Sequence, residues 1–251
     1  MLDQITKSFG AKRAVDALSL AVPRGSLFGL VGPNGAGKTT TLSIATGLLR
    51  PHYGRVLVGG VDVWADPPAA KALMGVLPDG LRLFDRLSGR ELLRYVGLLR
   101  RVPPADIETR SRELLDALGL TGDADNLVVD YSSGMTKKIG LACALIHAPA
   151  LLVLDEPFEA VDPLSGEVIR GILRRFVAGG GTVIFSSHVM ELVEQLCDHL
   201  AVVAQGRVVA AGSLDAVRAG ESLQRRFLDL LGVAVPSEGV LTWLPSSSDS
   251  N

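Results

Sequence analysis

Eight consecutive residues, Gly32-Pro33-Asn34-Gly35-Ala36-Gly37-Lys38-Thr39, have the spacing G-x-x-x-x-G-K-[ST] of a phosphate-binding P-loop. Glycines let successive backbone N–H groups converge on phosphate oxygens, and a following helix adds the positive end of its dipole. In such a loop Lys38 reaches the β- and γ-phosphates, and the Thr39 hydroxyl ligates Mg²⁺. We therefore predict a nucleotide site that also includes the next residue, Thr40.

Two adjacent carboxylates end an apolar segment, Leu151-Leu152-Val153-Leu154-Asp155-Glu156. Neighbouring side chains of a strand point in opposite directions, so the two acids need not share a role. Asp155 suits the Mg²⁺ shell, and Glu156 suits a general base that polarises the water attacking the γ-phosphate. The alternative, a solvated strand end before Pro157, is weakened by the P-loop elsewhere in the chain.

A single histidine, His188, follows the apolar segment Thr182–Ser186. A lone histidine is usually a surface or core residue. At the end of a strand parallel to the one that carries Asp155, however, it would point into the nucleotide crevice. There its imidazole would contact the γ-phosphate and the attacking water.

The segment Tyr131-Ser132-Ser133-Gly134-Met135 precedes a predicted helix, Thr136–Ala148. Serine and glycine before a helix are ordinary N-cap residues. The same N-terminus is equally an anion site. The residue chemistry does not choose between these two interpretations.

Strand and helix patterns alternate around these motifs, which predicts an α/β fold with a mainly parallel sheet. Short apolar runs predict buried strands, and helical spacing of apolar residues predicts the helices between them. The predicted strands are Leu27–Val31, Gly75–Leu77, Ala150–Leu154 and Thr182–Ser186, with an edge strand or hairpin over Gly54–Val63 and a hairpin of Leu200–Ala204 with Arg207–Ala211. The predicted helices outside the middle of the chain are Lys38–Leu49, Leu164–Ala178, Val189–Cys197 and Ser213–Leu231.

The middle of the chain is predicted to be a helical insertion, at about residues 81–148. Ser88 and Glu91 have the spacing of a capping box at the start of a helix over Ser88–Arg101, and Ile107–Leu118 is a second amphipathic helix. Residues 1–235 are interpreted as one domain, and 236–251 as a flexible polar tail.

The composition is that of an ordinary globular protein: 251 residues, 47% hydrophobic and 21% charged, with a net charge of −2. Such a charge does not favour broad nucleic-acid binding. Cys143 and Cys197 lack the spacing of a metal site or disulfide framework, so both are expected to be packing residues in a reducing compartment. The most apolar stretch, Gly140–Leu154, is interrupted and shorter than the roughly 20 residues of a membrane span. The first ten residues are too polar for a signal peptide.

Taken in order, the P-loop, the YSSGM segment, the LVLDEP segment and the following histidine resemble the ATPase subunit of ABC transporters, over roughly residues 5–212. The similarity is greatest to prokaryotic exporters of drugs, polysaccharides or ions. It implies an ATP-hydrolysing P-loop core with an antiparallel β edge, a helical subdomain, ATP and Mg²⁺ as cofactors, and a position on the cytoplasmic face of the membrane. The implied partners are a second ATPase subunit and a separate transmembrane permease, with no nucleic acid.

The resemblance also implies roles for individual residues. Phe9 corresponds to the aromatic residue that stacks on adenine. Ser132 and Gly134 match the signature that binds the γ-phosphate held by the opposite subunit, although Ser133 replaces a glycine of that signature. Asp162 matches the acid of the loop that links the two sites across the dimer.

Two features depart from the family pattern. Asp79 stands where the family has a glutamine; it would still reach Mg²⁺ or water, but a second anion near the γ-phosphate is costly without the metal. Only about eight residues precede Phe9, so the family's first strand is predicted to be short or missing. A truncated start would weaken adenine binding.

Two other functions compete with the transporter interpretation. One is a soluble ATPase of the same family that acts on ribosomes or DNA, which the single cassette and near-neutral charge disfavour. The other is a degenerate regulatory nucleotide binder, which Ser133 and Asp79 favour. Intact Lys38, Asp155, Glu156 and His188 oppose it.

Overall fold

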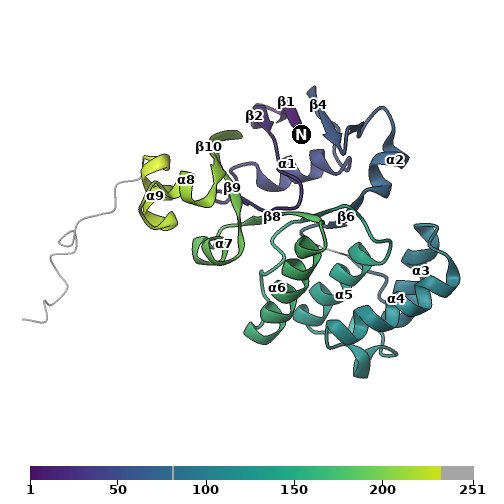
Figure 1. The fold of residues 1–251 in the computed structure, drawn as a ribbon. Helices are drawn as coiled ribbons and strands as arrows, with labels where there is room; N and C mark the ends of the chain where they lie inside the picture. The colour runs from purple at the N-terminus through teal and green to yellow at the C-terminus, as the bar shows by residue number, and fades with distance from the viewer. Residues whose placement is uncertain (81, 233–251) are drawn as a thin grey trace, which may run out of the picture.

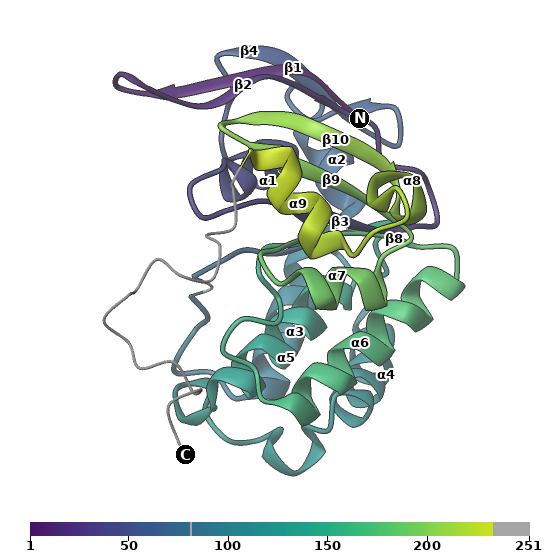
Figure 2. The same ribbon diagram turned by 90° about the vertical axis from the view of Figure 1, so that its left-hand side faces the viewer.

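The computed structural model describes residues 1–80 and 82–232. A six-stranded sheet lies at the centre, with a smaller four-stranded sheet on one side and a group of helices on the other (Figure 1, Figure 2). The polar tail predicted for residues 236–251 lies outside the described residues.

The central sheet has the strand order β10-β9-β3-β8-β7-β6, and its five strands other than β10 run parallel. This arrangement confirms the predicted α/β class with a mainly parallel sheet. β10 pairs antiparallel with β9 through a turn at Gln205-Gly206, as predicted for that hairpin. The strands are β3 (Leu27–Val31), β6 (Met74–Leu77), β7 (Leu151–Leu154), β8 (Thr182–Ser187), β9 (His199–Ala204) and β10 (Arg207–Ser213).

The four-stranded sheet is antiparallel and has the order β2-β1-β4-β5. Its strands are β1 (Leu2–Phe9), β2 (Lys12–Leu20), β4 (Tyr53–Val58) and β5 (Val61–Asp62). The expectation of a short or missing strand before Phe9 was wrong, because β1 has eight residues and pairs with a strand on each side. The alternation of its side chains is broken at Gln4, which has φ 48°, and by irregular pairing on both sides.

One set of helices is inserted between β6 and β7, and the other helices lie before β6 or after β7 in the chain. The inserted set is α3 (Gly89–Leu99), α4 (Pro104–Ala117) and α5 (Ser133–Leu145), with short 3₁₀ turns at Thr121–Asp123 and Val128–Asp130. The remaining helices are α1 (Lys38–Ala45), α2 (Pro67–Ala72), α6 (Pro163–Ala178), α7 (Met190–Leu196), α8 (Leu214–Arg218) and α9 (Leu223–Leu231). None of the helices in the described part of the chain is long and apolar enough to cross a membrane.

The ends of the helices agree with the sequence-based predictions at some positions and differ from them at others. The predicted capping box at Ser88 and Glu91 is present at the start of α3. Helix α5 begins three residues earlier than predicted, with Ser132 as its N-cap. The single helix predicted over Ser213–Leu231 is two helices, because the chain turns through left-handed conformations at Ala219 and Gly220.

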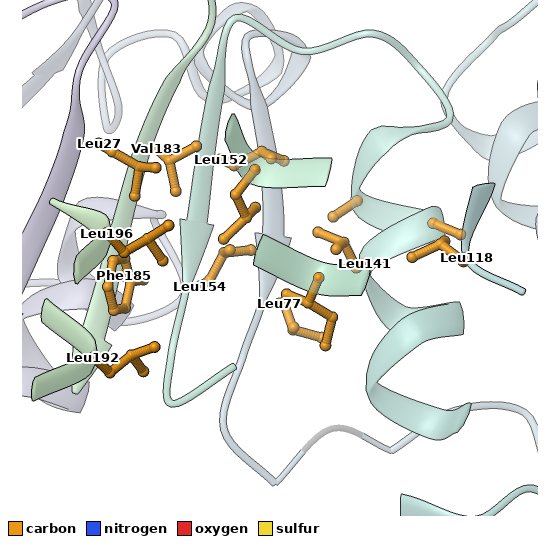
Figure 3. Close-up of a cluster of buried hydrophobic side chains, with 14 of the residues drawn as sticks. Leu27, Leu77, Leu118, Leu141, Leu152, Leu154, Val183, Phe185, Leu192 and Leu196 are labelled. Carbon is orange, nitrogen blue, oxygen red and sulfur yellow. The ribbon is translucent and has the colours of Figure 1, made fainter. Parts of the chain in front are cut away.

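Two hydrophobic cores lie on opposite faces of the central sheet. Strand alternation separates them: Leu152 and Leu154 pack toward α5, α6 and α7, whereas Val153 packs toward α1 and the four-stranded sheet. Figure 3 shows the first of these cores, in which Phe185 of β8 lies among leucines from the neighbouring strands and α7. The sheet is therefore held on both faces, and the ends of its parallel strands are fixed relative to one another.

Candidate nucleotide-binding site

The P-loop connects β3 to α1, the strand–loop–helix arrangement predicted for it. Two of its glycines lie against backbone: a Cβ on Gly32 would be 2.3 Å from the Val203 carbonyl oxygen, and one on Gly37 would be 2.3 Å from that of Ala14. Gly37 also has φ 106° and precedes the first residue of α1. Glycine is required at both positions, because any side chain there would displace the loop from the strands around it.

Lys38 is buried, with only 6% of its surface exposed. Its ammonium donates a hydrogen bond to the Gly32 carbonyl at 2.8 Å and lies 3.7 Å from the Glu156 carboxylate. A buried charge is costly unless it is hydrogen-bonded and paired, and these two contacts meet that need for the Lys38 ammonium.

A cavity of about 480 Å³ lies over this loop. Its lining includes most of the residues that the P-loop and resemblance arguments predicted for nucleotide binding, brought from five parts of the chain. These lining residues are Phe9, Asn34, Gly35, Ala36, Gly37, Lys38, Thr39, Thr40, Asp79, Glu156 and His188. Of the other predicted P-loop residues, Gly32 and Pro33 form the entry of the loop beneath Lys38, whose ammonium points to their carbonyl oxygens.

Phe9 lies at the end of β1, and 52% of its surface is exposed, so it is not a core residue. Its ring lies at the rim of the cavity, with the Lys7 ammonium 5.7 Å from the ring centre. An exposed aromatic ring beside a phosphate-binding loop is suited to stacking on a nucleotide base.

Glu156 and His188 meet across the ends of β7 and β8, which are adjacent parallel strands. The Nδ1 atom of His188 lies 3.1 Å from one Glu156 carboxylate oxygen, and the other oxygen faces Lys38. The crevice position predicted for His188 therefore brings it to Glu156. A carboxylate, an imidazole and a lysine around one point can polarise a water beside a phosphate group.

Asp155 lies behind this cluster and is 4% exposed. Its Oδ1 atom accepts a hydrogen bond of 2.5 Å from the Ser186 hydroxyl. With Thr39 and Asp79 it lines a small cavity of about 60 Å³ that adjoins the P-loop. Hydroxyl and carboxylate oxygens are ligands that Mg²⁺ prefers. Among the described residues no three carboxylate, histidine or cysteine side chains lie close enough together to hold a metal by themselves.

Three predicted residues lie elsewhere in the fold. Ser132, Gly134 and Asp162 do not line the cavity, but they lie beside one another at the adjacent N-termini of α5 and α6. A Cβ on Gly134 would be 2.9 Å from an Asp162 carboxylate oxygen, and the Ser133 hydroxyl donates to the Ala160 carbonyl. Hydrogen bonds from the Ser165 backbone and hydroxyl lower the pKa of Asp162, so this acid is charged at neutral pH.

Several residues of the site were not predicted from the sequence. Lys12 and Ala14 of β2 and Glu159 after β7 line the cavity, because tertiary packing brings them over the P-loop. Ser186 holds both acids, since it donates to Asp155 and accepts from the Glu156 N–H at 2.8 Å. Its position beside the predicted histidine was the nearest available signal. The cavity lining carries two lysines, Lys12 and Lys38, against the three carboxylates Asp79, Glu156 and Glu159.

Comparison with known proteins identifies the class to which this fold and site belong. The family described as ABC transporter matches residues 15–159, and the chain belongs to that family. It is an ATP-binding and ATP-hydrolysing subunit of the ABC transporter type.

Two curated relatives illustrate the similarity. The chain is 36% identical over 211 residues to a linearmycin resistance ATP-binding protein of Bacillus subtilis (strain 168), covering 84% of this chain and 68% of the relative. It is 40% identical over 211 residues to a Nod factor export ATP-binding protein of Rhizobium meliloti, covering 84% of this chain and 63% of the relative.

Solved structures agree with this fold. An ATP-binding subunit of an ABC transporter superposes with a TM-score of 0.86 at 28% identity, covering 92% of this chain and 98% of that chain. A dimeric cassette bound to ADP and phosphate has the same fold, with a TM-score of 0.78 at 22% identity, covering 85% of this chain and 97% of that one.

Proposed function

We propose that two ATPase subunits, at least one of them this chain, clamp two Mg-ATP molecules between them and so drive export through a separate permease. Each nucleotide would lie between the P-loop of one subunit and the 131–135 segment of the other. The observation that carries this proposal is that Ser132, Gly134 and Asp162 lie together outside the cavity that the P-loop lines. A helix N-terminus exposed beside a loop of this kind can bind an anion held by another chain.

Within the cavity, Lys38 leaves the P-loop carbonyls to bind the β- and γ-phosphates, and backbone N–H groups of the loop bind the remaining oxygens. Glu156 accepts the proton of the attacking water, and His188 orients Glu156 and stabilises the γ-phosphate. Phe9 stacks on the adenine. Loss of the γ-phosphate removes the contacts that hold the two subunits together. The subunits then separate, and this movement changes the conformation of the permease bound to them.

Mg²⁺ would be held by the Thr39 hydroxyl, Asp155 and the phosphates, and it would neutralise charge on the transferred phosphoryl group. Asp155 is suited to this role because Ser186 fixes one of its oxygens. Asp79 lines the same small cavity as Thr39 and Asp155, so we assign it a part in metal binding as well.

The variant Asp79→Asn tests this assignment, because it removes a charge but keeps the shape of the side chain. We expect it to weaken Mn²⁺ binding in the presence of a non-hydrolysable ATP analogue, measured by electron paramagnetic resonance. It should also tighten binding of metal-free ATP, because fewer carboxylates then oppose the phosphates. Each effect is expected at about 3- to 10-fold, the size of one charge contact of about 4 Å that water screens.

Glu159→Gln is the matched control, since Glu159 lines the large cavity but not the small one. It should affect metal-free ATP alone. Equal Mn²⁺ affinity in wild type and Asp79→Asn would remove Asp79 from the metal site and leave the rest of the proposal intact.

Export and a membrane partner are supported by the relatives, whose names describe linearmycin resistance and Nod factor export. We assign the chain to the cytoplasmic face of the membrane, bound to a permease that provides the path for the transported molecule. The inserted helices α3, α4 and α5 are the part of the chain that we assign to contact with the permease, and residues of about 81–148 remain a proposed subdomain. The named transporter relatives favour this function over a ribosomal, nucleic-acid or purely regulatory role.

The two-subunit clamp is tested by Gly134→Asp in a chain that also carries Glu156→Gln. A side chain at position 134 would be 2.9 Å from the Asp162 carboxylate and would place a second anion where the partner's γ-phosphate binds. Light scattering should find a dimer of Glu156→Gln with Mg-ATP, but a monomer that still binds ATP when Gly134→Asp is added. Gly122→Asp, at a glycine with open space around it, is the control and should still dimerise. A dimer of the Gly134→Asp chain with two bound nucleotides would contradict the clamp.

A further inference from the structure

The backbone of Glu156 is in a strained conformation. Its φ is 45°, in the left-handed region that is unfavourable for a residue with a Cβ. Such conformations occur at functional sites and persist only where neighbouring groups fix them. The groups that fix this residue therefore determine where its carboxylate points.

Both backbone polar groups of Glu156 are bound by side chains from other elements. Its N–H donates to the Ser186 hydroxyl of β8 at 2.8 Å. Its carbonyl accepts a hydrogen bond of 3.0 Å from the Lys137 ammonium, and a second one of 3.2 Å from the backbone N–H of Glu159. A hydrogen bond from a charged donor is stronger than one between neutral groups, so Lys137 is the stronger of the two carbonyl partners.

Lys137 lies in the first turns of α5, the helix that Ser132 caps and that carries Gly134. Its side chain is half-buried and reaches from this helix to the end of β7. One ionic hydrogen bond therefore joins the helix that begins at the 131–135 segment to the backbone of Glu156. No role was predicted for Lys137 from the sequence.

We infer that Lys137 is a positioning residue for Glu156, which sets the direction of its carboxylate and makes that direction depend on the position of α5. The inference rests on the proposed role of Glu156 as the general base. When the partner's γ-phosphate binds at the N-terminus of α5, the same helix holds the base that acts in this chain's own site. Lys137 in this way links clamp closure to readiness for hydrolysis.

The test is a double-mutant cycle of Lys137→Met and Glu156→Gln in the full chain. Lys137→Met alone should lower kcat by about 10- to 100-fold, the effect of a displaced catalytic group, while the Kd for ATP stays unchanged. Added to Glu156→Gln, it should cause no further loss in single-turnover hydrolysis, because the group that it positions is already gone. The double variant should still form the ATP-bound dimer.

Two matched variants separate positioning from a structural role. Lys137→Arg keeps a charged donor of similar reach and should restore most of kcat. Lys71→Met, at an exposed lysine of α2, should leave kcat at the wild-type value. Thermal unfolding shows whether each variant is folded; if Lys137→Met is not, Lys137→Gln replaces it in the cycle.

The contradicting outcomes differ from one another. A wild-type kcat in Lys137→Met, or an equal fold loss with and without Glu156→Gln, would overturn the positioning role. Loss of ATP binding or of the trapped dimer would instead place Lys137 in the clamp itself and also overturn it. Wild-type turnover by Glu156→Gln alone would refute the proposed base, which is a separate failure.

Discussion

Replacement of Glu156 by glutamine is expected to reduce ATP hydrolysis by about 10²- to 10⁴-fold, the usual contribution of a general base. The amide keeps the size of the side chain but cannot accept a proton from water. ATP binding should persist, because the proposed function assigns phosphate binding to Lys38 and the P-loop backbone. With Mg-ATP present, the variant should accumulate as a dimer, since the step that opens the clamp is blocked.

The measurements are steady-state phosphate release, equilibrium binding of a fluorescent ATP analogue, and light scattering. Glu159→Gln serves as the control, because Glu159 lines the same cavity and has the same charge. It should keep a substantial rate. Hydrolysis by Glu156→Gln at the wild-type rate would show that another group accepts the proton.

Replacement of Lys38 by methionine has a comparably large expected effect, but at the binding step. In the proposed site the ammonium makes the charged contacts to the β- and γ-phosphates, and hydrogen bonds to charged groups contribute about 1.5–3 kcal/mol each. The Kd for Mg-ATP should therefore rise by roughly 10- to 100-fold, with hydrolysis lost as well. Methionine also leaves the Gly32 carbonyl and the Glu156 carboxylate without their buried partner.

Lys12→Met is the matched control for this experiment, because Lys12 lines the same cavity from β2 rather than from the P-loop. It should weaken ATP binding to a smaller extent and keep hydrolysis. An unchanged Kd in Lys38→Met, with the protein shown to be folded by circular dichroism, would contradict the proposed role of this lysine.

Local sequence signals predicted the central sheet and the P-loop because each is a contiguous pattern with one physical cause. The run Leu151–Leu154 is apolar on both faces, as a strand between two cores must be. The first strand was harder to predict: its buried side chains, Leu2 and Ile5, flank an irregularity at Gln4 instead of alternating. Its pairing partners, β2 and β4, determine that it is a strand.

In the candidate site, too, the residues that belong to local motifs were predictable and the others were not. Lys38, Asp155 and Glu156 lie in motifs, whereas Lys12, Ser186 and Lys137 act through contacts with distant residues. Those contacts depend on sheet order and helix placement, which no local pattern encodes. The positive φ of Glu156 likewise follows from three segments meeting at one residue.

The central claim, that this ATPase powers a membrane transporter, is most directly tested by co-purification. Tagged Glu156→Gln chain would be isolated with Mg-ATP from gently solubilised native membranes, and the proteins bound to it identified by mass spectrometry with their stoichiometry. The account predicts that a polytopic membrane protein is recovered in a fixed ratio to the ATPase. Recovery from the soluble fraction alone, or with ribosomes or nucleic acid, would contradict it.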